Sequence, residues 1–334
     1  MPPTFYILDH PLLPTPYNHR FFVEKFAEGF THHGFEVRVV DRLDAIRSPG
    51  FVMISNHDCF QGWANGRLRR LLSGPGPLQP GTRLTAPIGR RGRERVARKL
   101  ARRLRGLDGV VVIAWSWHPD SGLLESLELP VIFAGESYWE EPQGEGQRQW
   151  RSFNKRHPNA LPIEFAAAVD PEQIGEGCAN EAIDCSFVGS AAYKPDWQRA
   201  FAAEPRNRII GTPPYISEAK RLEVLRNSKV LLGLHSDSNI ANALPVERVY
   251  EGLAFGAVVI SDNPAAVGAT DGIARYAPSL DEARRLVDSV LSNERERTEL
   301  RDRGLEFARH RGTYAHRAAA FISLREKLLT SETA

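Results

Sequence analysis

The chain has 334 residues, of which 42% are apolar and 25% are charged, and its formal net charge is +2. This length suits two domains rather than one core, and the balanced charge gives no support for a polyanionic partner. Cys59, Cys178 and Cys185 lack CxxC spacing, which argues against a disulfide framework or zinc cage. With no apolar run of ~18 residues and no signal-peptide pattern, we expect a cytoplasmic protein.

The first half alternates apolar strands with helical segments. Apolar residues at a spacing of four predict a helix at His19–His33, which Gly34 ends. Strands are predicted at Phe5–Asp9, Glu36–Asp41, Phe51–Ser55, Val110–Ala114 and Pro130–Ala134. Uninterrupted Val/Ile runs of this kind are typical of a parallel sheet covered on both faces. We therefore predict an α/β fold whose first doubly wound, Rossmann-like domain spans residues 1–165.

The second half repeats this pattern after a polar, Gly- and Pro-rich stretch from Glu140 to Ala182, which is predicted as loop or linker. Strands are predicted at Asp184–Ser190, Arg206–Gly211, Ser228–Leu234 and Ala257–Asp262. A capping box of Ser279 and Glu282 is predicted to begin an amphipathic helix. We expect a second Rossmann-like domain at 183–312 and a helix at 313–330 that packs back on the first. The cleft between the domains is the expected ligand site.

The segment PVERVYEGLAFGAVVISD, residues 245–262, carries the strongest functional signal. Pro245 is predicted in the first turn of a helix and Gly256 at its left-handed stop. Arg248 then lies in the first turn, where a cation opposes the helix dipole unless an anion binds there. Glu251 is suited to accept hydrogen bonds from a sugar hydroxyl. The other interpretation, a surface ion pair between Arg248 and Glu251, stays open at this stage.

From Arg248 onward this segment resembles the donor-site motif R-x-[FY]-E-x-x-A-x-G of GT-B glycosyltransferases. The earlier DCSFVGS, residues 184–190, resembles the strand that opens the C-terminal domain of the spore-protein-like CgeB/YkvP type. The resemblance covers roughly Asp184–Ile322 and implies a GT-B fold with two domains facing a cleft. It implies that Arg248 approaches the donor diphosphate and that Glu251 holds the donor sugar or ribose. Retaining relatives often have a second glutamate where this chain has Ala243, so inversion and retention both stay open.

Further donor contacts are predicted at strand ends and in the loop before the motif. A Gly-Ser turn after a strand lets the backbone approach a phosphate, although a simple turn explains it equally. The loop His235–Leu244 is small and polar, and we expect His235 and residues 236–242 to supply the contacts of the missing glutamate. The candidate donor-binding residues are Gly189, Ser190, His235, Ser236, Asn242, Arg248 and Glu251.

The catalytic base is sought at the carboxyl edge of the first sheet. His19 begins the first helix and has the acid–base chemistry required near neutral pH, although Asn18 and His19 also suit a simple helix cap. Asp58 and Glu136 follow predicted strands, the second beside Tyr138 and Trp139. His19, Asp58 and Glu136 are the candidate bases. No DxD motif marks a metal site, so we expect metal-independent transfer with the nucleotide-sugar as substrate and no cofactor.

A basic stretch, Arg90–Arg105, has apolar residues on one helical face. We favour a solvated helix that covers the sheet. Contact with anionic membrane lipid or an acidic acceptor is the functional alternative, and no motif supports nucleic acid. The overall prediction is a glycosyltransferase that moves a sugar from a nucleotide-sugar to a hydroxyl of a glycan, lipid-linked or small-molecule acceptor. It would be cytoplasmic, with peripheral contact to the inner membrane face as an option. The alternatives are a non-catalytic nucleotide- or glycan-binding GT-B protein and a GT-B sugar-nucleotide epimerase.

Overall fold

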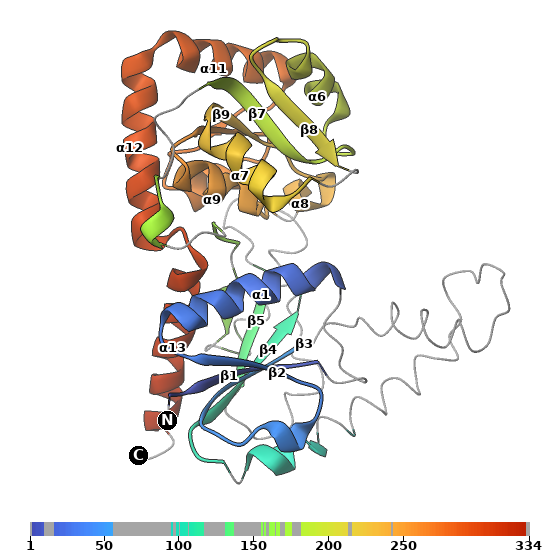
Figure 1. Cartoon of the computed structure of the whole chain (residues 1–334), viewed down its shortest axis with the longest axis vertical. Helices are drawn as coiled ribbons and strands as arrows, with labels where there is room; N and C mark the ends of the chain where they lie inside the picture. Colours follow the sequence, from blue (N-terminus) through green and yellow to red (C-terminus); the bar gives the residue numbers. More distant parts are fainter. Residues whose placement is uncertain are drawn as a thin grey trace, which may run out of the picture. The chain divides into compact units, whose positions relative to one another are not determined.

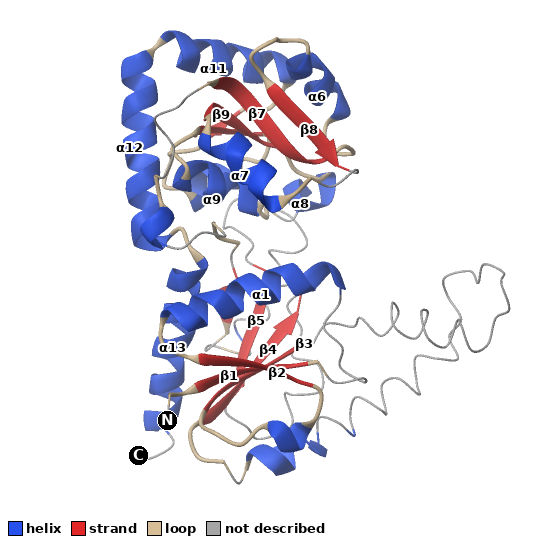
Figure 2. Cartoon of the chain, in the orientation of Figure 1, coloured by secondary structure: helices blue, strands red, loops and turns tan. Residues whose placement is uncertain are grey.

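The computed structural model divides the chain into two compact units. The residues it describes are 2–9, 17–55, 95, 98–99, 101–105, 107–116, 131–136, 155, 157, 160–163, 165–167, 171–175, 182–212, 216–241 and 243–331. Each unit is built on its own parallel sheet (Figures 1 and 2). None of the helices in the described ranges is both long and apolar enough to cross a membrane.

The first unit contains a parallel sheet with the strand order β2-β1-β3-β4-β5-β6. Its strands are β1 (Thr4–Leu8), β2 (Glu36–Val40), β3 (Gly50–Ser55), β4 (Val110–Ser116), β5 (Val131–Glu136) and β6 (Leu161–Ile163). The predicted strands of this half are confirmed to within two residues at each end. The stretch predicted as loop or linker holds β6 and a short 3-10 helix, η3 (Pro171–Gln173), so that prediction was incomplete. A strand as short as β6 leaves too little periodicity to detect.

The core of the first unit is a cluster of phenylalanines between helix and sheet. Helix α1 (Tyr17–His32) ends before Gly34, whose φ of +78° is the predicted left-handed stop. Phe30 of α1 stacks on Phe5 of β1, with ring centroids 4.1 Å apart. Phe26, one turn earlier, meets Phe321 near the end of the chain at 5.1 Å. Aromatic pairs at these separations add to the stability gained from burying the rings.

The second unit contains a five-stranded parallel sheet with the order β11-β10-β9-β7-β8. Its strands are β7 (Ile183–Ser190), β8 (Arg208–Thr212), β9 (Ser228–Gly233), β10 (Val258–Ser261) and β11 (Arg275–Tyr276). Its helices are α6 (Pro195–Ala202), α7 (Glu218–Arg226), α8 (Asp237–Ala241), α9 (Glu247–Ala254), α10 (Ala265–Ala269), α11 (Leu280–Ser292), α12 (Glu294–Arg311) and the first turn of α13 (Tyr314–Ser331). The four strands predicted for this half are all present.

Helices cover both faces of this second sheet, as continuous apolar strands require. On one face, Trp197 of α6 and Val287 of α11 pack with Val230 and Ile260. On the other, α9, α10 and α12 pack on Val259, which points the opposite way along β10. The predicted capping box is confirmed, because the Ser279 hydroxyl accepts the Glu282 amide at 3.2 Å.

The last helix, α13, is divided between the units. Residues up to Arg317 belong to the second unit, and the helix from Ala318 onward belongs to the first. In the first unit the Arg325 guanidinium donates to the Gly109 carbonyl at 2.6 Å and lies over the Phe51 ring. The first unit is therefore completed by residues far along the chain.

Candidate functional site

Helix α9 lies against the second sheet with its N-terminus at the carboxyl end of the strands. Gly252 makes the close packing possible, since a Cβ there would come within 2.7 Å of side chains on β9 and β10. Gly256, with φ +77°, ends the helix in the predicted left-handed conformation. The prediction for Pro245 was wrong, because the helix begins at Glu247 and Val246 is its cap. Pro245 therefore precedes the helix instead of occupying its first turn.

Arg248, in the first turn of α9, is held by groups that do not neutralise it. Its Nη2 donates to the Leu234 carbonyl at 3.0 Å, and its guanidinium carbon lies 5.1 Å from the Phe187 ring centre. Within the described part of the chain it forms no ion pair, and its buried Nε has no hydrogen-bond partner. Desolvation lowers the pKa of Arg248. The site thus holds a cation that lacks an anionic neighbour in contact.

Gly189 faces this guanidinium from the end of β7. A Cβ at position 189 would lie 2.7 Å from Arg248 Nη1 and 2.9 Å from the Phe187 ring, so a side chain does not fit there. Ser190 ends β7, and its hydroxyl accepts the Ala192 amide at 3.3 Å. The structure thus brings Gly189 and Arg248, two of the predicted donor-binding residues, into contact.

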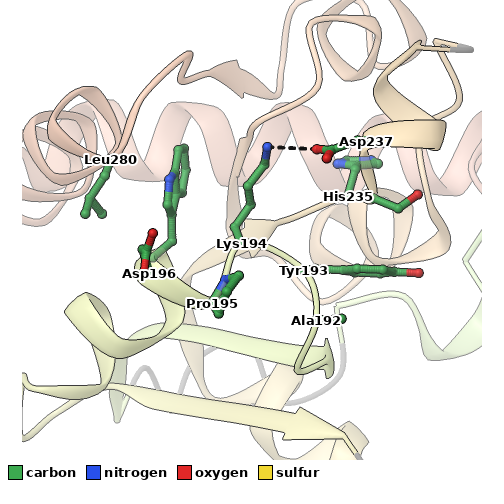
Figure 3. Close-up of a pocket in the computed structure, with 10 residues that line it drawn as sticks. Ala192, Tyr193, Lys194, Pro195, Asp196, His235, Asp237 and Leu280 are labelled. Carbon is green, nitrogen blue, oxygen red and sulfur yellow. Dashed lines mark hydrogen bonds and ion pairs between the residues drawn. The ribbon is translucent and has the colours of Figure 1, made fainter.

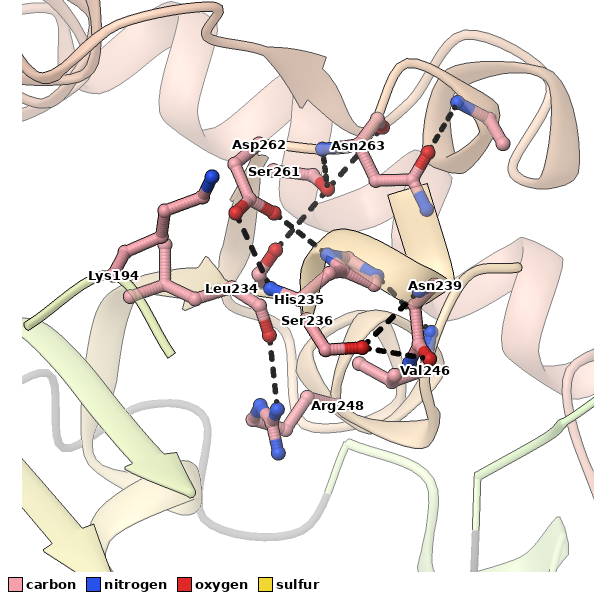
Figure 4. A network of polar contacts seen from close by, with 12 residues as sticks. Lys194, Leu234, His235, Ser236, Asn239, Val246, Arg248, Ser261, Asp262 and Asn263 are labelled. Atoms are coloured by element: carbon pink, nitrogen blue, oxygen red, sulfur yellow. Dashed lines mark hydrogen bonds and ion pairs between the residues drawn. The ribbon is translucent and has the colours of Figure 1, made fainter. Parts of the chain in front are cut away.

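His235, two residues beyond β9, is buried, and both of its ring nitrogens are hydrogen-bonded (Figure 4). Its Nδ1 lies 2.7 Å from Asp262 Oδ1, and its Nε2 accepts the Val246 amide at 3.1 Å. This pattern places the proton on Nδ1 of a neutral ring. Burial lowers the pKa of His235, which outweighs the opposing effect of Asp262. The His235 ring therefore links Val246, the cap residue of α9, to Asp262, the residue that follows β10.

Glu251 is buried and forms an ion pair with Arg221 of α7 at 2.5 Å. The alternative interpretation of Arg248 and Glu251 as a surface ion pair was therefore wrong. Glu251 lies inside the domain, where Arg221 compensates its charge. Arg221 is supplied by α7, which the motif around residues 245–262 does not include.

Ser236 and its neighbours form the cap of a short helix. The Ser236 hydroxyl accepts the Asn239 amide at 3.1 Å and donates to the Asn239 side chain at 3.0 Å. This is the ordinary role of serine before a helix. Asn242, the remaining predicted donor contact, lies outside the described residues.

A pocket of about 600 Å³ opens beside this site (Figure 3). Tyr193, Lys194 and Trp197 come from the segment after β7, and His235, Ser236 and Asp237 from the segment after β9. Lys194 pairs with Asp237 at 3.4 Å in this pocket. The Tyr193 ring also lies 5.8 Å from the Arg248 guanidinium, so the pocket and the arginine share a wall.

The described residues leave the prediction of the candidate bases untested. His19 lies in the first turn of α1 and Glu136 is the last residue of β5, but the directions of their side chains are not described. Asp58 lies outside the described residues. In the basic stretch, Ala101 and Leu104 are buried while Arg98, Lys99 and Arg102 are exposed, which agrees with a helix that covers the sheet. No group of three or more His, Cys, Asp or Glu side chains in the described ranges is arranged to hold a metal.

Sequence analysis missed four residues of this site: Asp262, Arg221, Glu247 and Tyr314. For Asp262 a signal existed. The β9–β10 register pairs Gly233 with Ser261, so polar residues just beyond these two strand ends are neighbours. The Tyr314 hydroxyl donates to the Glu247 carboxylate across 67 residues of sequence, and no local pattern predicts such a contact.

Comparisons with known proteins agree with this geometry. Residues 175–323 match the family model described as Glycosyl transferase-like. Trehalose 6-phosphate synthase from Burkholderia multivorans has a TM-score of 0.55 at 10% identity, covering 99% of this chain and 100% of that one. AviGT4, a glycosyltransferase involved in avilamycin A biosynthesis, has a TM-score of 0.50 at 16% identity, covering 98% and 99%. No curated protein sequence matches the chain.

The chain therefore has the GT-B fold, and residues 175–323, most of which lie in the second unit, are similar to the glycosyl transferase-like family. The narrower resemblance to the spore-protein-like type stays a prediction.

Proposed function

We propose that this protein transfers a sugar from a nucleotide-sugar donor to an acceptor hydroxyl, and that the donor diphosphate binds at the first turn of α9. The observation that carries the proposal is Arg248. A desolvated guanidinium without a contacting anion is costly, and a diphosphate would supply the missing charge. The aromatic rings of Phe187 and Tyr193 keep the guanidinium in position until the donor arrives.

Two further features support a diphosphate at this place. The cap residue Val246 makes no side-chain hydrogen bond to the first turn of α9, so that turn keeps amide donors for an anion. Gly189 lets the Arg248 guanidinium lie directly against the end of β7, where any larger residue would clash with it. As the bond to the sugar breaks, negative charge develops on the departing diphosphate, and these fixed positive groups stabilise it. In this proposal His235 positions α9 rather than contacting the donor.

The direct test is calorimetric binding of UDP-glucose, ADP-glucose and GDP-mannose to the wild-type chain and to Arg248→Ala. We expect one nucleotide-sugar to bind, and its affinity to fall about 100-fold in the variant, which corresponds to about 2.7 kcal/mol. Arg295→Ala is the control, because Arg295 is 91% exposed on α12, where it pairs with Glu299. Unchanged donor affinity in Arg248→Ala would show that Arg248 does not bind the diphosphate.

Binding alone does not separate a transferase from its alternatives. The measurement that does so is the release of nucleoside diphosphate from the bound donor, with and without a mixture of sugar, lipid-linked and small-molecule acceptors. Stimulated release supports transfer. Conversion of the donor to an isomeric nucleotide-sugar points to an epimerase, and binding without turnover points to a non-catalytic protein.

We also propose that transfer is independent of metal, with Arg248 and the α9 amides supplying the positive charge. Activity should then survive EDTA, and a loss restored by Mg²⁺ would contradict this. His19, Asp58 and Glu136 remain the proposed bases. If one of them deprotonates the acceptor, its substitution by Ala, Asn or Gln respectively should lower kcat by about 10²–10⁴ and leave donor affinity intact.

The acceptor surface is proposed to include the exposed basic residues within Arg90–Arg105. Arg98, Lys99 and Arg102 are exposed and Leu104 is buried, so this segment presents cations outward. Such a surface suits an anionic membrane on the cytoplasmic side. Sedimentation with vesicles of phosphatidylglycerol against phosphatidylcholine tests it, and equal sedimentation with both would contradict it.

A further inference from the structure

Glu247 and Tyr314 form a contact that the proposed transfer reaction does not require. Glu247 is the first residue of α9, and the buried Tyr314 begins α13. The Tyr314 hydroxyl donates to Glu247 Oε1, and the backbone of Ala166 hydrogen-bonds the same hydroxyl. The carboxyl group is therefore held in a fixed place, next in sequence to Arg248.

The charged groups around Glu247 leave it without a neutralising partner. The groups that face it are Glu251 and Arg248 on α9, Arg221 on α7 and Tyr314 on α13. Arg221 pairs with Glu251, and the Arg248 guanidinium is directed toward Gly189 and Phe187. Within the described ranges, Glu247 makes no ion pair of its own. Burial, followed by repulsion from Glu251, raises the pKa of Glu247 to about 7.

A bound diphosphate would add negative charge close to this carboxyl group. An additional like charge favours the neutral, protonated form of a carboxylic acid. The proton would come from solvent, and the neutral group would no longer repel the diphosphate. Conversely, an ionised Glu247 would weaken the attraction that Arg248 exerts on the donor.

Resting on the proposed donor site, we infer that Glu247 is a positioning residue that takes up a proton when a nucleotide-sugar diphosphate binds beside Arg248, while Tyr314 holds its carboxyl group in place. The free protein carries this proton below about pH 7 and loses it above that pH. Donor affinity should consequently be highest on the acid side of neutrality and should fall as the pH rises.

The test is calorimetry with the best-binding member of UDP-glucose, ADP-glucose and GDP-mannose, whose diphosphate diester keeps the same charge between pH 6 and pH 8.5. In the wild type, affinity should fall about tenfold over this range, as a pKa displaced by about one unit requires. Glu247→Gln should hold the affinity within about twofold throughout. Runs at pH 7 in phosphate and in Tris buffer report the protons taken up, and this uptake should disappear in Glu247→Gln.

Two further variants separate a charge effect from a structural one. Tyr314→Phe keeps the ring but removes the hydroxyl. Because the hydrogen bond from this hydroxyl lowers the pKa of Glu247, its loss should raise that pKa and move the midpoint of the affinity change to higher pH. Glu223→Gln, an exposed carboxyl group on α7 paired with Lys220, should behave like the wild type.

The two ways of failing are distinct. Donor binding with the same pH dependence and the same proton uptake in the wild type and in Glu247→Gln would overturn the inference and leave the donor site intact. Absence of binding by all three nucleotide-sugars would instead overturn the proposed function, and the inference with it.

Discussion

His235 and Arg248 both lie at the N-terminal end of α9, yet their surroundings differ. Every polar atom of the His235 ring has a partner within the protein, supplied by Asp262 and by the Val246 amide. Arg248 keeps a buried Nε without a partner in the described part of the chain, and its guanidinium lies directly against Gly189. The first arrangement is complete within the protein, whereas in the proposed donor site a ligand would complete the second.

The largest effect on stability is expected from breaking the hydrogen bonds of His235. Asp262→Ala would leave the Nδ1 proton and backbone amide of His235 without their acceptor in a buried place. We expect a loss of about 3 kcal/mol in the free energy of unfolding, measured by urea denaturation. Asp288→Ala, an exposed position on α11, is the control and should change stability by less than about 0.5 kcal/mol. A variant as stable as this control would show that the His235 network is not structural.

A smaller effect on stability is expected from adding a side chain at Gly189, beside Arg248. Gly189→Ala would place a methyl group against Arg248 Nη1 and the Phe187 ring, both closer than 3.0 Å. We expect the unfolding free energy to fall by about 1–2 kcal/mol. Donor affinity should fall about tenfold as the guanidinium is displaced. Gly268→Ala is the matched control, since nothing lies within 4 Å of its added methyl group. Donor affinity equal to that of Gly268→Ala would place the diphosphate elsewhere.

The smallest effect is a pH dependence that belongs to His235 alone. Burial lowers the pKa of His235 below its ordinary value of 6.5, so below pH 6.5 the unfolded chain binds a proton that the folded chain does not. Stability should therefore fall as the pH drops from 6.5, by at most about 1.4 kcal/mol per pH unit from this residue. Urea denaturation of the wild type and His235→Gln at pH 7.5 and pH 5.5 isolates the contribution. Equal losses in both proteins would contradict it.

The sequence predicted the strands well because each is a continuous apolar run, and such runs have few other uses in a soluble α/β protein. It also predicted the left-handed stop at Gly256 and the cap at Ser279, which depend on local geometry alone. The start of α9 was misplaced because its cap amide is bound by His235, a partner eleven residues earlier.

The partners of His235 and Glu251 could not be predicted from the sequence, and the reason is physical. Asp262 meets His235, and Arg221 meets Glu251, only because strand order and helix packing bring distant segments together. The donor-site hypothesis rested on Arg248 and Glu251. Only the folded structure shows that the charge of Glu251 is neutralised by Arg221. The roles of His19, Asp58, Glu136 and Asn242 stay predictions.

The division of α13 between the units has a consequence for how the protein is made. Phe26 and Phe30 leave the ribosome early, yet the ring that covers Phe26 belongs to Phe321. The first unit therefore cannot complete its core while the second is still being synthesised, although domains usually fold in the order in which they emerge. Until α13 has been synthesised, the nascent first unit lacks the Phe321 ring that packs on Phe26.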